Sequence, residues 1–273
     1  MVKVQAQRNL LMVIEYDGTN YAGWQIQPGR RNVQACLVDV LSTILNHPVN
    51  LRASGRTDAG VHALGQVANC KTTSSLPLPI LFRALNANLP DDIRVINLLE
   101  APFSFDARKD AKKKQYMYWI YCGSHFPVFL RHYVYCPGDF TINWPLLREC
   151  VQLFVGTHDF TSFSASGSSA VNMIREISRF EAKDYGSGFL AFTVEGNGFL
   201  YKMVRLLLGE IWMVQIGKKR IDDLRWALKH HQREKNRLCL PPHGLYLTRV
   251  NYPDLDPFQG VPDPAFPFQP SLF

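Results

Sequence analysis

The chain has 273 residues, 47% of them hydrophobic, so it is long enough for one large domain or two ordinary ones and too apolar to be disordered throughout. Thirty basic residues against 23 acidic ones give a net charge of +7, which favours a polyanionic partner. The six cysteines are scattered without a C-x-x-C pair, which argues against a structural zinc site or a disulfide framework. With no N-terminal signal sequence and no apolar run long enough to span a bilayer, we expect a cytoplasmic protein with reduced thiols.

The first half of the chain predicts elements in the order β-α-β-β-α-β, which is typical of the split βαβ arrangement. Asn32 is expected to cap the first helix, because apolar residues recur after it at intervals of three and four. The expected elements are a strand over 10–16, a helix over 33–45, strands over 49–53 and 63–70, a helix over 80–88 and a strand over 93–99.

The second half repeats much of this order. Its expected elements are strands over 116–122 and 132–135, a helix over 144–155, strands over 175–184 and 189–195, helices over 200–215 and 221–233, and a strand over 245–250. The predicted fold class is therefore α+β, with two similar ferredoxin-like halves whose mainly antiparallel sheets join around a central cleft. We place the halves at 1–105 and 106–252, and expect residues 253–273, rich in Pro, Phe and Asp, to be a surface-draped tail without secondary structure.

The residues GRTDAGVHA at 55–63 are the most informative stretch of the chain. They connect two expected strands and set one carboxylate, Asp58, among small residues, with the guanidinium of Arg56 two positions before it. Because glycine lets a ligand approach closely, Asp58 is a candidate nucleophile or general base whose charge an arginine stabilises. The alternative is a tight turn in which the aspartate bonds its own backbone.

The segment YDGTNYAGWQIQ at 16–27 contains amides that suit base edges or phosphates. An ordinary loop with Tyr21 and Trp24 folded onto the core is the favoured alternative. A second basic segment, 218–237, carries eight Lys or Arg against three acids. It fits either a solvated helix face or contacts with phosphates.

In KKKQYMYWIY at 112–121, three lysines precede alternating aromatic residues. A period of two sends Tyr116 and Tyr118 to one face of a strand and Met117 and Trp119 to the other. A surface ring beside basic residues suits RNA, since it stacks on a base for about 1–3 kcal/mol. A strand with core tyrosines explains the pattern equally well.

Arg205 falls inside the apolar helical run of GFLYKMVRLLLG at 198–209. A guanidinium is always charged, so its burial requires a partner, and a buried carboxylate such as Asp58 would serve. The alternative is a long side chain that reaches the surface.

Taken together, these segments resemble the tRNA pseudouridine synthase A family, whose members isomerise uridines in the anticodon stem-loop. The match is collinear over about 10–252, and GRTDAGVHA is by itself highly specific for the family. The other motifs that carry the resemblance are YDGTNYAGWQ, the K-x-Y-x-Y pattern at 114–118, HDFTSF at 158–163, GFLYKMVR and GLYL at 244–247.

The resemblance implies a role for each of four residues. Asp58 is the catalytic aspartate, Arg56 its neighbouring arginine, Tyr116 the tyrosine that stacks against the target base, and Arg205 the arginine that pairs with the aspartate. It also implies a homodimer that acts on the anticodon arm of tRNA without metal or cofactor and without a membrane. Asp58 then attacks C1′, adds to C6 of the uracil, or removes the C2′ proton, and the residue types do not choose among these roles.

Two other classes of function compete with this interpretation. A non-catalytic RNA-binding module or folding chaperone explains the charge and the aromatic residues, but gives no reason for Asp58 between arginine and glycines. A metal-dependent nuclease that uses Asp58 and His62 lacks the further carboxylates of a two-metal site. His62 and the pair His158-Asp159 are more typical of structural histidines than of a metal or acid–base site.

Overall fold

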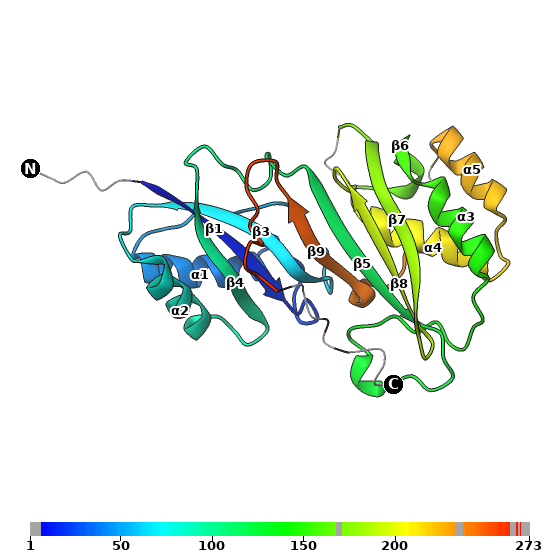
Figure 1. Ribbon diagram of the computed structural model, residues 1–273, viewed down its shortest axis with the longest axis horizontal. Helices are drawn as coiled ribbons and strands as arrows, with labels where there is room; N and C mark the ends of the chain where they lie inside the picture. The colour runs from blue at the N-terminus through cyan, green and yellow to red at the C-terminus, as the bar shows by residue number, and fades with distance from the viewer. Residues whose placement is uncertain (1–6, 168–170, 233–236, 263–265, 267, 269–273) are drawn as a thin grey trace, which may run out of the picture. The chain divides into compact units, whose positions relative to one another are not determined.

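The chain divides into two compact units. The computed structural model describes residues 7–167, 171–232, 237–262, 266 and 268. The first unit contains residues 1–112 and 247–265, and the second contains residues 113–246 and 266–273. Each unit combines helices with a mostly antiparallel sheet (Figure 1), which confirms the α+β class and the mainly antiparallel pairing.

The sheet of the first unit has the strand order β4-β1-β3-β9, with β2 beside β3. Its strands are β1 (Arg8–Tyr16), β2 (Arg52–Ala53), β3 (His62–Thr72), β4 (Ile93–Ala101) and β9 (Leu245–Asn251), the last of which enters this unit at Leu247. β1 pairs antiparallel with both β3 and β4, and its residues from Leu10 to Ile14 are wholly buried. A continuous apolar run such as LLMVI is expected where both faces of a strand are covered.

Helices α1 (Val33–Leu45) and α2 (Leu78–Asn88) belong to the same unit and lie on one side of its sheet (Figure 1). Asn32 caps α1, as predicted, because its side chain accepts a hydrogen bond from Ala35 N at 2.9 Å. The buried stripe of α1 consists of Val33, Leu37, Leu41 and Leu45. The predicted helix over 33–45 is therefore confirmed to the residue, and the stripe packs it onto the core.

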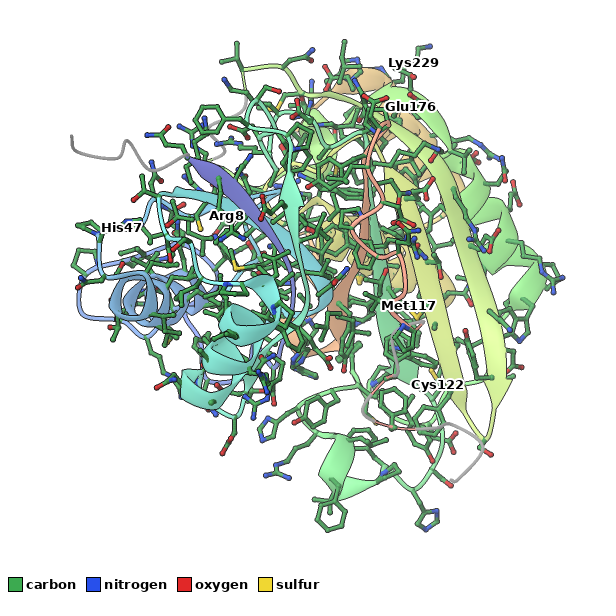
Figure 2. All side chains as sticks on the ribbon, turned by 60° about the vertical axis from the view of Figure 1, so that its left-hand side comes forward. Arg8, His47, Met117, Cys122, Glu176 and Lys229 are labelled. Atoms are coloured by element: carbon green, nitrogen blue, oxygen red, sulfur yellow. The ribbon has the colours of Figure 1, made fainter. Side chains whose placement is uncertain are left out.

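The sheet of the second unit has the order β5-β8-β7-β6, with every pairing between these strands antiparallel. Its strands are β5 (Lys113–Tyr121), β6 (Gly156–Asp159), β7 (Ile174–Gly186) and β8 (Phe189–Gly196). Its helices are α3 (Trp144–Leu153), α4 (Met203–Gln215) and α5 (Ile221–His230), with 3₁₀ helices at Val128–Leu130, Thr161–Phe163 and Pro242–Gly244. α4 is buried along most of its length. On β5, Met117 lies midway along the strand and Cys122 lies just beyond its end (Figure 2).

Three short strands differ from the prediction. The expected strand over 49–53 is reduced to the two residues of β2, which alone pair with β3. The expected strand over 132–135 is wrong: only Tyr135 forms a bridge, to Ile120, and Pro137 soon after it cannot donate to a ladder. β6 was not expected, because its residues GTHD lack the alternation of apolar and polar residues that identifies a half-buried strand.

Two helix ends also differ, and each difference has a backbone cause. α4 begins at Met203 rather than at 200, because Lys202 adopts a left-handed φ of 58°. α5 ends at His230, because His231 has a φ of 53°; the last expected position, 233, lies outside the described residues. None of the helices within the described ranges is both long enough and apolar enough to cross a membrane.

Residues 106–112 pack with the first unit instead of linking two halves. Ala107 N donates to Asn69 Oδ1 at 2.9 Å, and Lys112 N donates to the carbonyl of Asn251, the last residue of β9, at 2.9 Å. These bonds explain why the compact units divide at 112/113, whereas the expected halves, 1–105 and 106–252, divide at 105/106. The first unit also takes in most of the last strand, β9, from Leu247 onward.

The C-terminal tail packs aromatic side chains into both units. In the first unit Phe258 is 7% exposed, and its ring fills the space above Gly65, where an added Cβ would lie 2.7 Å away. In the second unit Phe268 is 7% exposed, with its ring centre 5.0 Å from that of Trp119. The described tail residues form no helix or strand, as predicted. The expectation that the tail lies on the surface is wrong for Phe258 and Phe268, which are buried. Burial of each ring stabilises the fold by about 1.5–3 kcal/mol.

Candidate active site

The GRTDAGVHA segment supplies the loop between β2 and β3 of the first unit, and its last two residues, His62 and Ala63, begin β3. Within it Arg56 is exposed, Thr57 is buried and Asp58 is half-buried. Val61 N donates to Asp58 O at 3.2 Å across a turn in which Gly60 has a φ of +76°. The loop is thus a tight turn closed by a main-chain hydrogen bond, and it leaves the carboxylate of Asp58 partly accessible.

The buried side chain of Thr57 anchors the loop. Its hydroxyl is hydrogen-bonded to the hydroxyl of Tyr16 at 2.8 Å, and its carbonyl accepts a hydrogen bond from Trp24 N at 3.1 Å. Burial raises the pKa of Tyr16, so that hydroxyl stays protonated in neutral solution. The residue before Asp58 is therefore tied through both its side chain and its backbone.

Two glycines allow the segment 16–27 to approach the loop this closely. A Cβ at Gly23 would lie 2.6 Å from Thr57 O, and the φ of +98° at this position is rare for other residues. A Cβ at Gly18 would lie 2.0 Å from Val61 O. Larger residues at either position would push the two segments apart.

The aromatic residues of the segment 16–27 fold onto the core, as the favoured alternative predicted. Tyr21 is 3% exposed and Trp24 is 2% exposed. The Tyr21 hydroxyl donates to Asp92, and the Tyr21 carbonyl accepts from Gly60 N at 3.3 Å. Through the second of these bonds Tyr21 helps to hold the Asp58 loop, a role that the sequence did not reveal.

His62 occupies a buried, structural position at the start of β3. Its ring is 2% exposed, and Nδ1 accepts a hydrogen bond from Gly18 N at 3.0 Å and lies 3.1 Å from Asp17 Oδ1. The ring therefore joins the Asp17-Gly18 turn to β3, which supports the structural interpretation of this histidine. Among the described residues, no group of three or more His, Cys, Asp or Glu is placed to hold a metal.

In the second unit Tyr116 lies on β5 and is 8% exposed. Its ring meets that of Phe199 edge to face, with centres 5.3 Å apart and planes at 89°. Tyr118 is buried, donates its hydroxyl to Pro241 O at 2.8 Å, and has a pKa raised by that burial. Trp119 instead packs against Phe268 of the tail, so the expected alternation of faces is observed.

Arg205 is half-buried on α4, and its Nε donates to Leu240 O at 2.7 Å. Leu240 N returns a hydrogen bond to Arg205 O at 3.1 Å. The positive charge of Arg205 partly offsets the effect of burial on the pKa of Tyr118. Arg205 is therefore held beside β5 within its own unit, and its pairing with Asp58 stays a prediction.

Several basic residues of the segment 218–237 are already bound within the second unit. Lys219 Nζ donates to the buried Glu210 at 2.6 Å, and Arg225 contacts both Asp222 and Glu149 at 2.6 Å. Arg237 donates to main-chain carbonyls of Ser162 and Ser164; the residues 233–236 lie outside the described ranges. These contacts favour the solvated, internally compensated face over a continuous phosphate track.

The four residues singled out by the sequence thus fall in two places. Arg56 and Asp58 share one loop of the first unit, whereas Tyr116 and Arg205 lie on β5 and α4 of the second. The sequence did not identify the anchoring residues Tyr16 and Thr57. The only signal for them is the glycine-rich composition of both segments, which indicates close approach without naming the partner.

Comparison with known proteins assigns this arrangement to a family. Residues 12–108 and 150–253 match a family model described as tRNA pseudouridine synthase. A tRNA pseudouridine synthase A of Caldicellulosiruptor saccharolyticus is 41% identical over 246 residues, which cover 90% of this chain and 100% of the relative. A protein of the same name from Anoxybacillus flavithermus is 42% identical over 246 residues, covering 90% and 99%.

The similarity to solved structures is more remote. A chain in a crystal structure of a Cbf5–Nop10–Gar1 complex aligns with a TM-score of 0.37 and 13% identity. The alignment covers 88% of this chain and 58% of that one. The sequence relatives, not this likeness, identify the family.

Proposed function

The chain belongs to the tRNA pseudouridine synthase family and is therefore an isomerase, and we propose that it acts on uridines of the anticodon stem-loop with Asp58 as catalytic nucleophile or base. The observation that supports this proposal most is the Asp58 loop, a half-buried carboxylate in a turn anchored through Thr57 and closely approached by Gly23. A fixed carboxylate of this kind suits catalysis, because it need not be ordered when the substrate arrives.

The reaction conserves atoms and electrons. The N1–C1′ bond breaks, the uracil rotates, C5 joins C1′, the C5 hydrogen leaves as a proton and N1 gains one. Asp58 attacks C1′, adds to C6 or removes the C2′ proton, and each of these roles requires the ionised carboxylate. We assign Arg56 and Arg205 the task of favouring that form through their positive charge.

Tyr116 is proposed to stack against the target base. Flipping a stacked uridine out of an RNA stem costs a few kcal/mol, and stacking on one ring returns about 1–3 kcal/mol. The strand position of Tyr116 and its contact with Phe199 support this role, since a ring already held in place loses little entropy on binding.

The remaining proposals concern assembly and follow the family resemblance. The chain forms two split βαβ halves around a central cleft, works as a homodimer in the cytoplasm, and uses neither metal nor cofactor. Sedimentation of the pure protein tests the dimer. Addition of a chelator tests whether activity requires a metal, because a metal-dependent nuclease would lose activity and the synthase would not.

The decisive experiment maps pseudouridines in an anticodon-arm RNA after incubation with the pure protein. Wild-type protein should convert uridines in the arm, and Asp58→Asn should bind the same RNA without converting it. Binding without conversion by the wild type would instead identify an RNA-binding module. Cleaved RNA would identify a nuclease.

A further inference from the structure

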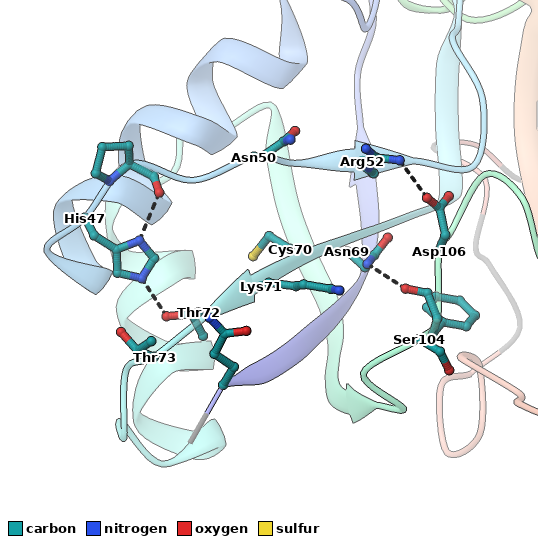
Figure 3. A pocket seen from close by; sticks show the side chains of 13 residues that line it. His47, Asn50, Arg52, Asn69, Cys70, Lys71, Thr72, Thr73, Ser104 and Asp106 are labelled. Atoms are coloured by element: carbon teal, nitrogen blue, oxygen red, sulfur yellow. Dashed lines mark hydrogen bonds and ion pairs between the residues drawn. The ribbon is translucent and has the colours of Figure 1, made fainter. Parts of the chain in front are cut away.

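A pocket of about 550 Å³ lies in the first unit (Figure 3), and its described lining includes no residue of the Asp58 loop. Its walls come from the chain between α1 and β2, from the last residues of β3, and from the loop after β4. The side chains that could contact a ligand include those of His47, Asn50, Arg52, Lys71 and Ser104. Its volume falls in the range of sites that hold small ligands or parts of large ones.

The pocket exists because β2 is short. β2 pairs with β3 only through Arg52 with Asn69 and Ala53 with Ala68, so β3 continues beyond the end of its neighbour. His47 holds the diverging chain in place: its Nδ1 donates to Pro48 O at 2.9 Å, and its Nε2 lies 2.7 Å from Thr72 Oγ1. The opening between the two segments is therefore braced at its outer edge (Figure 3).

Two cations share one face of the sheet at this opening. Arg52 stands opposite Asn69, and Lys71 is two residues further along the same strand, which places Arg52 and Lys71 as diagonal neighbours about 7 Å apart. Lys71 Nζ lies 3.7 Å from the centre of the Phe103 ring. No ion pair joins Lys71 to a carboxylate within the described part of the chain.

Asp106, the one carboxylate among the described residues of the lining, orients Arg52. It accepts hydrogen bonds from Arg52 Nη1 at 2.8 Å, Arg108 N at 2.9 Å and Lys109 N at 3.1 Å. Although burial alone raises the pKa of Asp106, these donors lower it overall, so the carboxylate is ionised in neutral solution and its oxygens are occupied. Most of the Arg52 guanidinium remains for a ligand.

We propose that this pocket binds a phosphate of the substrate RNA backbone through Arg52 and Lys71, outside the nucleotide on which Asp58 acts. The proposal rests on the proposed function for the identity of the RNA. The Arg52 side chain is 56% exposed and Lys71 is exposed, which suits a backbone that passes over the site better than an enclosed small molecule. Hydroxyl and amide groups such as Ser104 and Asn50 can reach the adjoining ribose.

The location of the pocket gives this contact a consequence. Arg52 lies in β2, which leads directly into the Asp58 loop, and Gln66 ties that connection by accepting from Ser54 Oγ at 2.7 Å and donating to Gly55 O at 2.9 Å. A phosphate held at Arg52 is thus connected to the catalytic loop through a few hydrogen-bonded residues. The contact should set the position of the RNA relative to Asp58.

The test compares charge variants in the affinity for an anticodon-arm RNA, measured by fluorescence anisotropy at several salt concentrations. Lys71→Gln should raise Kd about three- to tenfold and reduce the slope of log Kd against log salt by about 1. Lys71→Glu should raise Kd further. Lys71→Arg keeps the positive charge and should therefore retain the wild-type Kd. Arg83→Gln, an equal loss of charge at an exposed position of α2, should leave Kd unchanged.

Equal effects of Lys71→Gln and Arg83→Gln would overturn the proposal, because the effect would then reflect net charge alone. A second arm titrates inorganic phosphate and uridine monophosphate. If these bind at Lys71 while the RNA affinity of Lys71→Gln stays at the wild-type value, the pocket serves a free phosphate and the proposal is wrong. Binding is measured without turnover, so a missing isomerase activity would count against the proposed function and leave the phosphate contact standing.

Discussion

The residues proposed for catalysis are held in different ways in the two units. In the first unit Asp58 sits on a loop that polar contacts and close glycine packing hold in place, notably the hydrogen bond between Tyr16 and Thr57. In the second unit Tyr116 sits on a strand, where its ring packs against Phe199, and Arg205 sits on a largely buried helix, where it is also hydrogen-bonded to Leu240. The loop depends on a few directional bonds, whereas the strand and helix depend on many small contacts.

Because of this difference, the Asp58 loop should be more sensitive to substitution than the strand and helix that carry Tyr116 and Arg205. It should also fix the position of its functional side chain more tightly. A hydrogen-bonded turn places one carboxylate at one position, but a single misplaced atom disturbs it. A packed strand tolerates changes of similar volume. Substitutions in the two units should therefore fail in different ways.

The largest effect is expected at the carboxylate itself. Asp58→Asn keeps the size of the side chain but removes the charge, so the single-turnover rate of pseudouridine formation should fall by about a thousandfold or more. The RNA Kd should change by less than about threefold, since positioning comes from other contacts. A rate within tenfold of wild type would remove Asp58 from the reaction.

Tyr116 should show a smaller and graded loss. Because stacking depends on the ring and not on the hydroxyl, Tyr116→Phe should retain most of the activity, while Tyr116→Ala should lose about 5- to 150-fold, the equivalent of 1–3 kcal/mol. Thermal unfolding of both variants checks that the second unit stays folded. Equal losses in the two variants would assign the role to the hydroxyl.

Much of the regular structure around these residues is predictable from the sequence, because it depends on local patterns. Asn32 and the apolar stripe after it predict α1, and the run at the start of the chain predicts β1. The support of the Asp58 loop is not predictable in this way, since Tyr16 and Thr57 are 41 residues apart and each has many possible partners. The pocket beside Arg52 is equally hard to predict, because it arises where β2 stops pairing with β3 and the pattern of residues 49–53 does not indicate that stop.

Gly23 tests the support of the loop directly. Gly23→Ala places a Cβ 2.6 Å from Thr57 O at a φ of +98°, so the free energy of unfolding should fall by about 1–3 kcal/mol, with a loss of turnover. Gly29→Ala is the matched control, because Gly29 also has a positive φ, +69°, but no atom lies within 4 Å of an added Cβ. It should reduce stability by only about 1 kcal/mol and leave turnover unchanged. Equal effects would show that backbone strain, and not the approach to Thr57, is what matters.

The smallest effect concerns the pH dependence of the polar contacts in the first unit. Hydrogen bonds hold the pKa of Asp106 below its ordinary value despite its partial burial. The stabilisation is therefore complete above the unfolded pKa, near pH 4, and is lost as the pH falls through the lower folded value. Asp106→Asn keeps the shape and one acceptor, so it should make unfolding by urea less sensitive to pH between about pH 5 and 3, by less than about 1 kcal/mol. A variant that follows the wild-type pH profile would show that the packing of the loop after β4, and not the ionised carboxylate, fixes Arg52.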